Sequence, residues 1–298
     1  MSNKLFLFFF GIFFSMNIQA WPSRDITILV PYGPGGSVDS ITRACVTDLE
    51  QRFKVGVNVV NMPGAYNLVA MNHIIKKPND NHTFILSDPD IISGAAPGPQ
   101  QNSIYQEFIP VAVIGYAPFV LVGSPNNTTE NLRNQVRSNQ IINVGTVNTA
   151  SSSWLNQLRP KMINQVQYKG TGQQFLDLAG GNVDYSVGSI VAWAPFIQGG
   201  KINLVAVGST QRLAKYPNVP TFQEVGFKGT ASGQWWAVFA SKDTDPDAIT
   251  KFSQAMRAVV ASNDRIKKIA EPGMDLINLD LAQSRRFVTT EIEKMRGN

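Results

Sequence analysis

The loop from Pro31 to Asp39 carries the strongest signal for ligand chemistry. Gly33, Gly35 and Gly36 stand between a β-branched run and a segment with helical periodicity. Without Cβ atoms the backbone can approach a ligand closely, and the unpaired N–H groups of a helix start favour an anion. Ser37 can cap this helix or donate its hydroxyl to a carboxylate. The alternative is a tight turn with a capping serine. The glycine spacing fits neither a P-loop nor a dinucleotide fingerprint.

A second loop of this kind lies in the other half of the chain. Residues 145–155 follow a strand-like run and lead into a short helix, and most of their side chains are small hydroxyls or amides. A serine-rich run alone is usually a solvated turn. Ligands of open α/β sheets, however, bind beyond the carboxyl ends of the strands, where both loops are expected. The predicted contacts from this loop are Gly145, Thr146, Ser151, Ser152 and Ser153.

Groups of residues typical of catalytic sites are sparse. His73 and His82 are the two histidines of the chain, and neither has a second ligand at metal-binding spacing. We expect both to be exposed on a helix face or in a loop. No Gly-x-Ser-x-Gly pattern surrounds the serines of the second loop. We therefore predict no enzyme activity, no metal and no cofactor. The alternative from another class is a secreted hydrolase that uses Ser152 with His73 or His82.

Packing is the expected role of the cysteine and of most aromatic side chains. Cys45 falls on the apolar stripe of the first predicted helix, which favours burial over reactivity. Some aromatic residues could wall a cleft, although most aromatics belong to cores. The candidates are Tyr66, Trp193, Trp235 and Trp236.

The first twenty residues indicate export. Lys4 precedes an apolar run from Leu5 to Phe14, and a short segment ending at Ala20 follows, as in a signal peptide cleaved near Ala20. The run is shorter than the roughly 20 residues of a membrane-spanning helix. The single cysteine, Cys45, excludes an internal disulfide and a lipid anchor at the new N-terminus. The net charge of +5, without a long Lys/Arg cluster, gives no sign of nucleic-acid binding.

Strand-like and helix-like segments alternate along the chain, which predicts an α/β fold of two lobes. Apolar stretches at 111–122 and 235–240 are predicted to be strands that cross between the lobes. The expected divisions are a signal peptide at 1–20, lobe 1 at 21–123 and 234–298, and lobe 2 at 124–233. Further predicted strands are 26–30, 57–60, 83–86, 141–144, 183–187 and 204–207. Predicted helices lie around 38–49, 68–75, 171–179, 246–262 and 281–295.

With these elements in place, the chain resembles the periplasmic substrate-binding proteins of tripartite tricarboxylate transporters, often called Bug receptors. The resemblance covers essentially all of the chain after Ala20. Its motifs are Trp21-Pro22, Ile28-Leu29-Val30-Pro31-Tyr32 with Gly35-Gly36-Ser37 and Asp39, Asn61 with Pro63-Gly64-Ala65, Gly145-Thr146 before Ser151-Ser152-Ser153, Tyr168-Lys169-Gly170, Leu178 with Gly180-Gly181 and Val183-Asp184, Gly200-Lys201, and Asn218-Val219-Pro220-Thr221.

The resemblance implies a two-lobed periplasmic-binding fold (type II-like), with each lobe a mostly parallel sheet flanked by helices. It implies a monomeric periplasmic receptor that closes on a small carboxylate and delivers it to the transporter subunits in the membrane. A receptor for a two-component sensor kinase is the alternative within this class. The ligand contacts that the loops and the resemblance suggest are Tyr32, Gly33, Gly35, Gly36, Ser37, Asp39, Ser87, Asp88, Gly145, Thr146, Ser151, Ser152, Ser153, Gly188 and Ser189.

Several positions depart from the family pattern. Trp154 stands where a histidine is common, and Gly188 stands where an aspartate is common. The segment Ser87-Asp88-Pro89-Asp90 places two carboxylates where small uncharged residues are usual. If Asp88 faces the cleft, it would repel a simple dicarboxylate. We therefore hypothesise a ligand with a cationic or amide part besides its carboxylate. A solvated or helix-capping Asp88 is the alternative.

Overall fold

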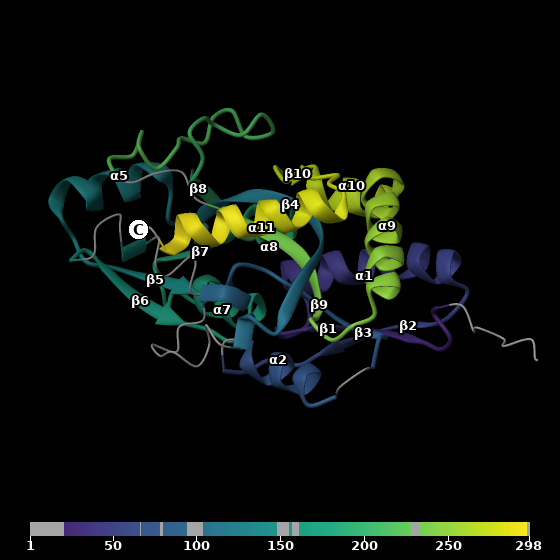
Figure 1. Cartoon of the computed structure of the whole chain (residues 1–298). Helices are drawn as coiled ribbons and strands as arrows, with labels where there is room; N and C mark the ends of the chain where they lie inside the picture. Colours follow the sequence, from purple (N-terminus) through teal and green to yellow (C-terminus); the bar gives the residue numbers. More distant parts are fainter. Residues whose placement is uncertain are drawn as a thin grey trace, which may run out of the picture.

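The computed structural model describes residues 21–65, 67–77, 80–93, 104–147, 155–156, 161–227 and 233–296. In these residues two groups of strands and helices lie at opposite ends of a long strand pair (Figure 1). Each group pairs parallel strands with antiparallel ones, so the structure is the mixed α/β, two-lobed fold that the alternation predicts.

The first sheet is built on three parallel strands in the order β2-β1-β3. Ile28 of β1 is in register with Val59 of β2 on one side and with Phe84 of β3 on the other. β1 is buried along most of its length, as its continuous apolar run predicts. β9 pairs antiparallel with β3, and β4 pairs antiparallel with β9 and with the short β10. The strands are β1 (Ile26–Val30), β2 (Val57–Asn61), β3 (Thr83–Ser87), β4 (Phe108–Gly123), β9 (Gly233–Ser241) and β10 (Asp275–Leu276).

The second sheet repeats this plan with the order β6-β5-β7. β5 pairs parallel with β6 and β7, and β4 adds antiparallel pairings with β7 and β8. The carboxyl ends of β5, β6 and β7 therefore meet at one edge, as do those of β1, β2 and β3 in the first sheet. The strands are β5 (Ile142–Thr146), β6 (Ile163–Gln167), β7 (Tyr185–Ser189) and β8 (Asn203–Val207).

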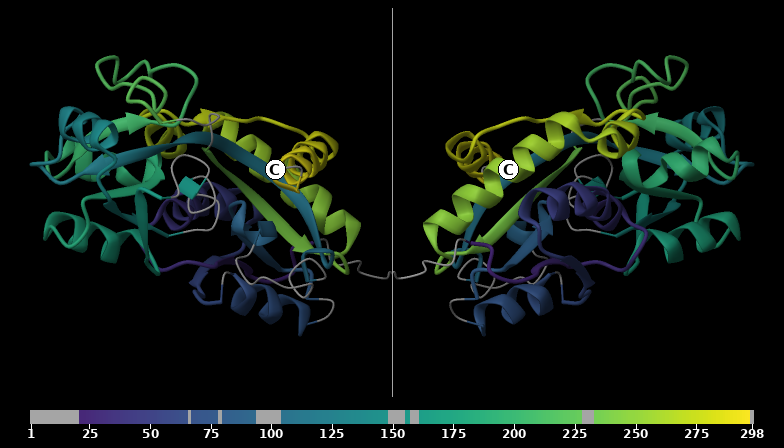
Figure 2. Two further views of the ribbon diagram at one scale, coloured as in Figure 1. Left: turned by 90° about the vertical axis from the view of Figure 1, so that its left-hand side faces the viewer. Right: turned by 90° about the vertical axis from the view of Figure 1, so that its right-hand side faces the viewer.

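β4 joins the two sheets because its 16 residues pair with partners in both. Its first part pairs with β9 from Phe108 to Pro118, and its last part pairs with β7 from Phe119 to Gly123. β4 and β9 run side by side as a long antiparallel pair (Figure 2). The apolar stretches at 111–122 and 235–240 lie within these two strands, of which β4 pairs with strands of both sheets and β9 pairs with β3 and β4.

Helices flank both sheets. α1 packs against β2, α9 and α10, while α7 and α8 pack against β7 of the second sheet. α9 and α11 both contact β4, so the C-terminal part of the chain returns to the first sheet (Figure 1). The helices are α1 (Ser37–Phe53), α2 (Leu68–Ile75), α3 (Asp90–Ser93), α5 (Thr129–Ser138), α7 (Thr171–Ala179), α8 (Ile190–Gln198), α9 (Pro246–Ser262), α10 (Asp264–Ala270) and α11 (Leu281–Arg296).

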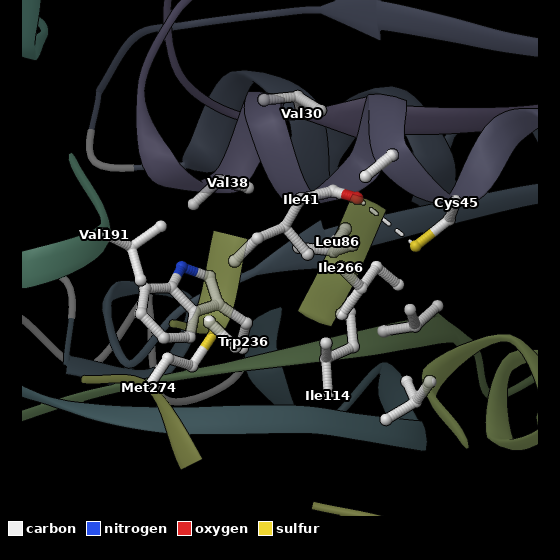
Figure 3. Close-up of a cluster of buried hydrophobic side chains, with 14 of the residues drawn as sticks. Val30, Val38, Ile41, Cys45, Leu86, Ile114, Val191, Trp236, Ile266 and Met274 are labelled. Carbon is white, nitrogen blue, oxygen red and sulfur yellow. Dashed lines mark hydrogen bonds between the residues drawn. The ribbon is translucent and has the colours of Figure 1, made fainter. Parts of the chain in front are cut away.

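One apolar cluster lies between α1 and the β4–β9 pair and reaches the second sheet. Ile41 and Cys45 of α1, Leu86 of β3, Trp236 of β9 and Val191 of α8 all belong to this cluster (Figure 3). The Cys45 thiol donates to the Ile41 carbonyl at 3.2 Å. Burial, with the nearby Asp48, raises the pKa of Cys45 to about 12, so the thiol stays protonated as a packing group.

Four aromatic rings form part of this cluster or pack against it. Phe252 of α9 stacks on Phe84 of β3 with ring centroids 3.9 Å apart and on Phe53 at 6.0 Å. Trp21 meets all three rings edge-on. α9 is held in place at its start because the Asp245 side chain accepts a hydrogen bond from the Asp247 N–H, with a proline at the first position.

We predict that Phe252→Ala lowers the free energy of unfolding by about 3–5 kcal/mol, because it empties a ring-sized volume that rigid neighbours cannot fill. Urea unfolding followed by circular dichroism measures this change. Leu176→Ala, at an exposed position of α7, is the control and should change the stability by less than about 0.5 kcal/mol. Similar losses for both variants would contradict this account of the core.

Candidate ligand-binding site

A cavity lies where the carboxyl-terminal edges of the two sheets face each other. Its volume of about 40 Å³ exceeds the roughly 10–15 Å³ that one water molecule requires, so its polar walls can hold water. The walls come from the loop after β1, the ends of β3, β5 and β7, the starts of α1, α7 and α8, and the start of β9. The lining residues are Tyr32, Gly33, Gly36, Ser37, Val38, Asp88, Val147, Gly170, Thr171, Gln174, Val187, Gly188, Ser189, Ala192 and Gln234.

Three helix starts from two sheets converge on this cavity. Gly36 precedes α1 and faces Thr171 of α7, whose hydroxyl would lie 3.9 Å from a Cβ atom placed on Gly36. Neither Gly36 nor Gly170 caps its helix with a side chain, whereas the Ser189 hydroxyl accepts a bond from the Ala192 N–H at the start of α8. The first N–H groups of a helix have no acceptor within the helix, and its dipole is positive at that end. The cavity is therefore suited to an anion.

Ser37 occupies the first turn of α1 instead of capping it. Its Oγ accepts a hydrogen bond from Trp236 Nε1 at 3.3 Å, and the residue lines the cavity. A serine hydroxyl that accepts in this way can still donate its own hydrogen. Of the two roles that the sequence allowed for Ser37, the geometry therefore fits the donor rather than the cap.

The Asp39 side chain stabilises the loop of Gly33, Gly35 and Gly36 that precedes α1. Its carboxylate accepts hydrogen bonds from the Gly35 N–H, from Asn61 Nδ2 and from Arg43 Nε. Gly35 adopts a φ of +85°, a conformation that favours glycine. Burial would raise the pKa of Asp39, but the hydrogen bonds from Arg43, Gly35 and Asn61 lower it overall. The carboxylate thus stays ionised and fixes the loop that precedes α1.

The Gln174 side chain stabilises the ends of two strands in the second sheet. Its buried side-chain amide donates to the Gly145 carbonyl at 2.7 Å and to the Val187 carbonyl at 3.0 Å, which ties the ends of β5 and β7 together. A Cβ atom on Gly145 would lie 2.8 Å from Ser186 Oγ, so this close approach requires glycine. The Thr146 hydroxyl donates to Gln167 Oε1 of β6. Gly145 and Thr146 therefore shape the edge of the sheet from which the second loop leaves.

Gly188 is held against the core by Trp193. A Cβ atom at residue 188 would lie 2.8 Å from Trp193 Nε1, and the Trp193 ring is fully buried. This contact restricts residue 188 to glycine, because a larger side chain on this strand would displace the indole.

The remaining corner of the cavity is acidic. Asp88 is 1% exposed and accepts hydrogen bonds from the Tyr32 hydroxyl and from Gln234 Nε2, both at 2.6 Å, and from the Asp90 N–H at 3.0 Å. Burial, together with the charges of Asp88 and Asp90, raises the pKa of Tyr32 well above its usual value. The Tyr32 hydroxyl therefore remains a donor to Asp88.

The described lining residues include no lysine or arginine, and Asp88 is the acidic residue among them. The donors that these described walls offer to an anion are backbone N–H groups and neutral side chains.

The structure divides the predicted contact residues into three groups. The first group lines the cavity: Tyr32, Gly33, Gly36, Ser37, Asp88, Gly188 and Ser189. The second group lies outside the described walls and supports them: Gly35, Asp39, Ser87, Gly145 and Thr146. The third group, Ser151, Ser152 and Ser153, lies outside the described residues, as does Trp154.

Sequence reasoning missed several residues of the wall, above all Thr171, Gln174 and Gln234. The signal for Thr171 was present, since Gly170-Thr171 stands between a strand and a helix as Gly36-Ser37 does. It was overlooked because β6 is polar in sequence (INQVQ) and does not look like a strand. Gln234 gave no such signal, because its position depends on the pairing of β9 with β4.

The expected exposure of both histidines is wrong for His82. This residue is buried, its Nε2 accepts from the Ser23 N–H, and its Nδ1 lies 2.9 Å from the Asp80 carbonyl. It precedes β3, whose opposite end carries Asp88, so about 16 Å of strand separates it from the cavity. The reason for the error is that a histidine with both ring nitrogens hydrogen-bonded can be buried. His82 is therefore not placed to serve as a base in the cavity.

The aromatic candidates belong to the core. Trp193, Trp235 and Trp236 are at most 1% exposed, and Tyr66 lies outside the described residues. Tyr32 is instead the aromatic residue that lines the described walls of the cavity.

Among the described residues, no cluster of three or more His, Cys, Asp or Glu side chains could hold a metal ion. In the same part of the chain, no helix combines the length and the hydropathy that a membrane span requires.

The fold and the cavity between the sheets define a two-lobed solute-binding receptor. A sequence profile described as "Tripartite tricarboxylate transporter family receptor" matches residues 41–297. Protein BugT of Bordetella pertussis is 27% identical over 299 residues, which cover 96% of this chain and 92% of BugT.

Two solved structures from R. palustris share the fold. Rpa4515, solved with adipate, is 24% identical with a TM-score of 0.81, and the match covers 93% of this chain and 96% of that one. MatC, solved with bound malate, is 23% identical with a TM-score of 0.81, and the match covers 92% and 98%. The chain belongs to the tripartite tricarboxylate transporter family of receptors. It is accordingly a binding protein, and the hydrolase alternative is excluded.

We predict that Gly188→Ala lowers the free energy of unfolding by about 1–3 kcal/mol, because the new methyl group would overlap the Trp193 indole in a closely packed core. Gly172→Ala is the matched control: no atom lies within 4 Å of the added methyl, and alanine favours the helix. Urea titration of both variants measures the difference. Equal stability of the two variants would show that Trp193 does not restrict residue 188.

The lowered pKa of Asp39 predicts a pH dependence of stability. A carboxyl whose pKa is lower in the folded protein stabilises it above the unfolded pKa of about 3.9, and this contribution is lost as the pH falls through the folded value. The melting temperature of Asp39→Asn should therefore lie below that of the native protein at pH 7. The gap should narrow as the pH falls from about 5 toward 2. Asp264→Asn, at an exposed carboxylate, is the control. A difference in melting temperature that stays constant with pH would contradict this role of the ionised Asp39 side chain.

Proposed function

We propose that this receptor captures a small carboxylate-bearing metabolite in the cavity between its sheets and delivers it to a transporter of the tripartite tricarboxylate type. The observation that supports this proposal most directly is the convergence of α1, α7 and α8, by their positive ends, on one cavity. A carboxylate matches such donors because its oxygens accept several hydrogen bonds at once.

In this proposal the two ends of the ligand site come from different lobes. Gly36 and Ser37 belong to lobe 1 (21–123 and 234–298), and Thr171 and Ser189 belong to lobe 2 (124–233). The lobes open and close about β4, which pairs with strands of both sheets, and a bound ligand stabilises the closed form because it is held from both sides. The serines at 151–153 remain predicted contacts from lobe 2.

The proposed ligand class agrees with the adipate and malate bound by Rpa4515 and MatC. A signal peptide cleaved near Ala20 would direct the protein to the periplasm. We expect the receptor to be a monomer there. There the subunits of the membrane transporter would be its partners. The family's function is the basis for expecting this ligand class, this location and these partners for the chain.

The test is a binding survey of the purified protein after extensive dialysis. Small mono-, di- and tricarboxylates and amino acids are screened by thermal shift, and hits are measured by titration calorimetry. At least one carboxylate should raise the melting temperature, because a ligand that binds the folded state stabilises it. Protein that no carboxylate stabilises would contradict the proposal.

A substitution at the facing helix start tests the position of the site. Thr171→Val removes a donor without changing the shape, and it should weaken the binding of the best ligand about tenfold, as expected for a hydrogen bond to a charged group. Thr47→Val, on the exposed face of α1, is the matched control and should bind as the native protein does. Equal affinities for the two variants would place the ligand elsewhere.

A further inference from the structure

We infer that Asp88 makes this receptor select carboxylates that also carry a protonated nitrogen, such as amino acids, over diacids of the same length. The inference rests on the proposed function, since it concerns the other end of the ligand whose carboxylate meets the helix starts.

The Asp88 carboxylate is fixed in the wall of the cavity. Both of its oxygens accept short hydrogen bonds, Oδ1 from the Tyr32 hydroxyl and Oδ2 from Gln234 Nε2, each at 2.6 Å. These donors come from the loop after β1 and from the crossing strand β9, so the carboxylate is oriented by two separate parts of the fold. Because the Asp90 N–H adds a third bond, Asp88 has the acceptor role of an ionised carboxylate.

The neighbours of Asp88 add to the negative potential of this corner. Asp90 is 2% exposed, and its Oδ2 lies 3.2 Å from the same Tyr32 hydroxyl that donates to Asp88. Asp90 thus places a second carboxylate close to the hydrogen-bonded pair of Tyr32 and Asp88.

The electrostatic potential therefore differs between two parts of the cavity wall. The starts of α1, α7 and α8 present N–H groups and the positive ends of helix dipoles, whereas Asp88 presents a buried negative charge on another part of the same wall. A ligand with a carboxylate at one end and an ammonium at the other matches both. A diacid would bring its second carboxylate toward Asp88 in a poorly solvated space, where like charges repel strongly.

The test compares pairs of ligands with equal carbon number that carry an ammonium or a second carboxylate at one end: 4-aminobutyrate with succinate, 5-aminopentanoate with glutarate, and 3-aminopropanoate with malonate. Titration calorimetry on the native protein should give the amino member of the best-bound pair an affinity at least about tenfold higher, as expected for a hydrogen bond between charged groups. Affinity for the diacid that equals or exceeds that for its amino partner would overturn the inference.

Asp88→Asn keeps the size of the side chain and removes its charge. It should shift the preference within that pair at least about tenfold toward the diacid, whereas Asp264→Asn should leave the preference unchanged. An unchanged preference in a folded Asp88→Asn variant would also overturn the inference. If this variant does not fold, the comparison of pairs on the native protein still decides the question.

The two proposals fail in different ways. Carboxylates that bind without a preference for an added ammonium refute the role of Asp88 and leave the receptor function standing. A protein that binds no carboxylate of either kind refutes both proposals.

Discussion

The antiparallel pairing of β4 with β9 is the constraint on which the rest of the structure depends. β4 is long enough to pair with β9 in the first sheet and with β7 and β8 in the second, so both sheets share one strand. This sharing turns the carboxyl edges of the two parallel strand sets toward a single cavity. It also places Gln234, at the start of β9, beside Asp88 at the end of β3. The site is thus assembled by strand pairings that connect distant parts of the sequence.

The cavity achieves its anion-binding character with neutral groups, and each group is held by a buried support. Asp39 fixes the loop before α1, Gln174 ties β5 to β7, and Trp236 donates to Ser37 from beneath. Such supports matter because a hydrogen-bond donor contributes fully only when its direction is set before the ligand arrives. Asp39, Gly145 and Thr146 thus hold the elements from which the residues of the described walls come.

Most of the fold could be predicted from the sequence, because local pattern and buried position agree. The bounds 26–30, 68–75, 171–179 and 246–262 coincide with β1, α2, α7 and α9. The elements β6, β10, α3, α5, α8 and α10 were not predicted. β6 is polar in sequence, β10 and α3 are short, and α8 is apolar along most of its length, without a polar face to show helical periodicity. Half of the predicted site, including Gly36, Ser37 and Asp88, lines the cavity. Thr171 and Gln234 could not be assigned, since no short-range pattern shows which strand ends and helix starts will face each other.

The absence of lysine and arginine from the described walls has a consequence for how a captured molecule is given up. The ammonium of a lysine or the guanidinium of an arginine would keep an anion bound to one lobe even after the lobes open. If the lobes open as proposed, Gly36 moves away from Thr171, and an anion held between them loses hydrogen-bond donors from both lobes in one movement. Release would then follow from the conformational change, without competition for a charged side chain of the described walls.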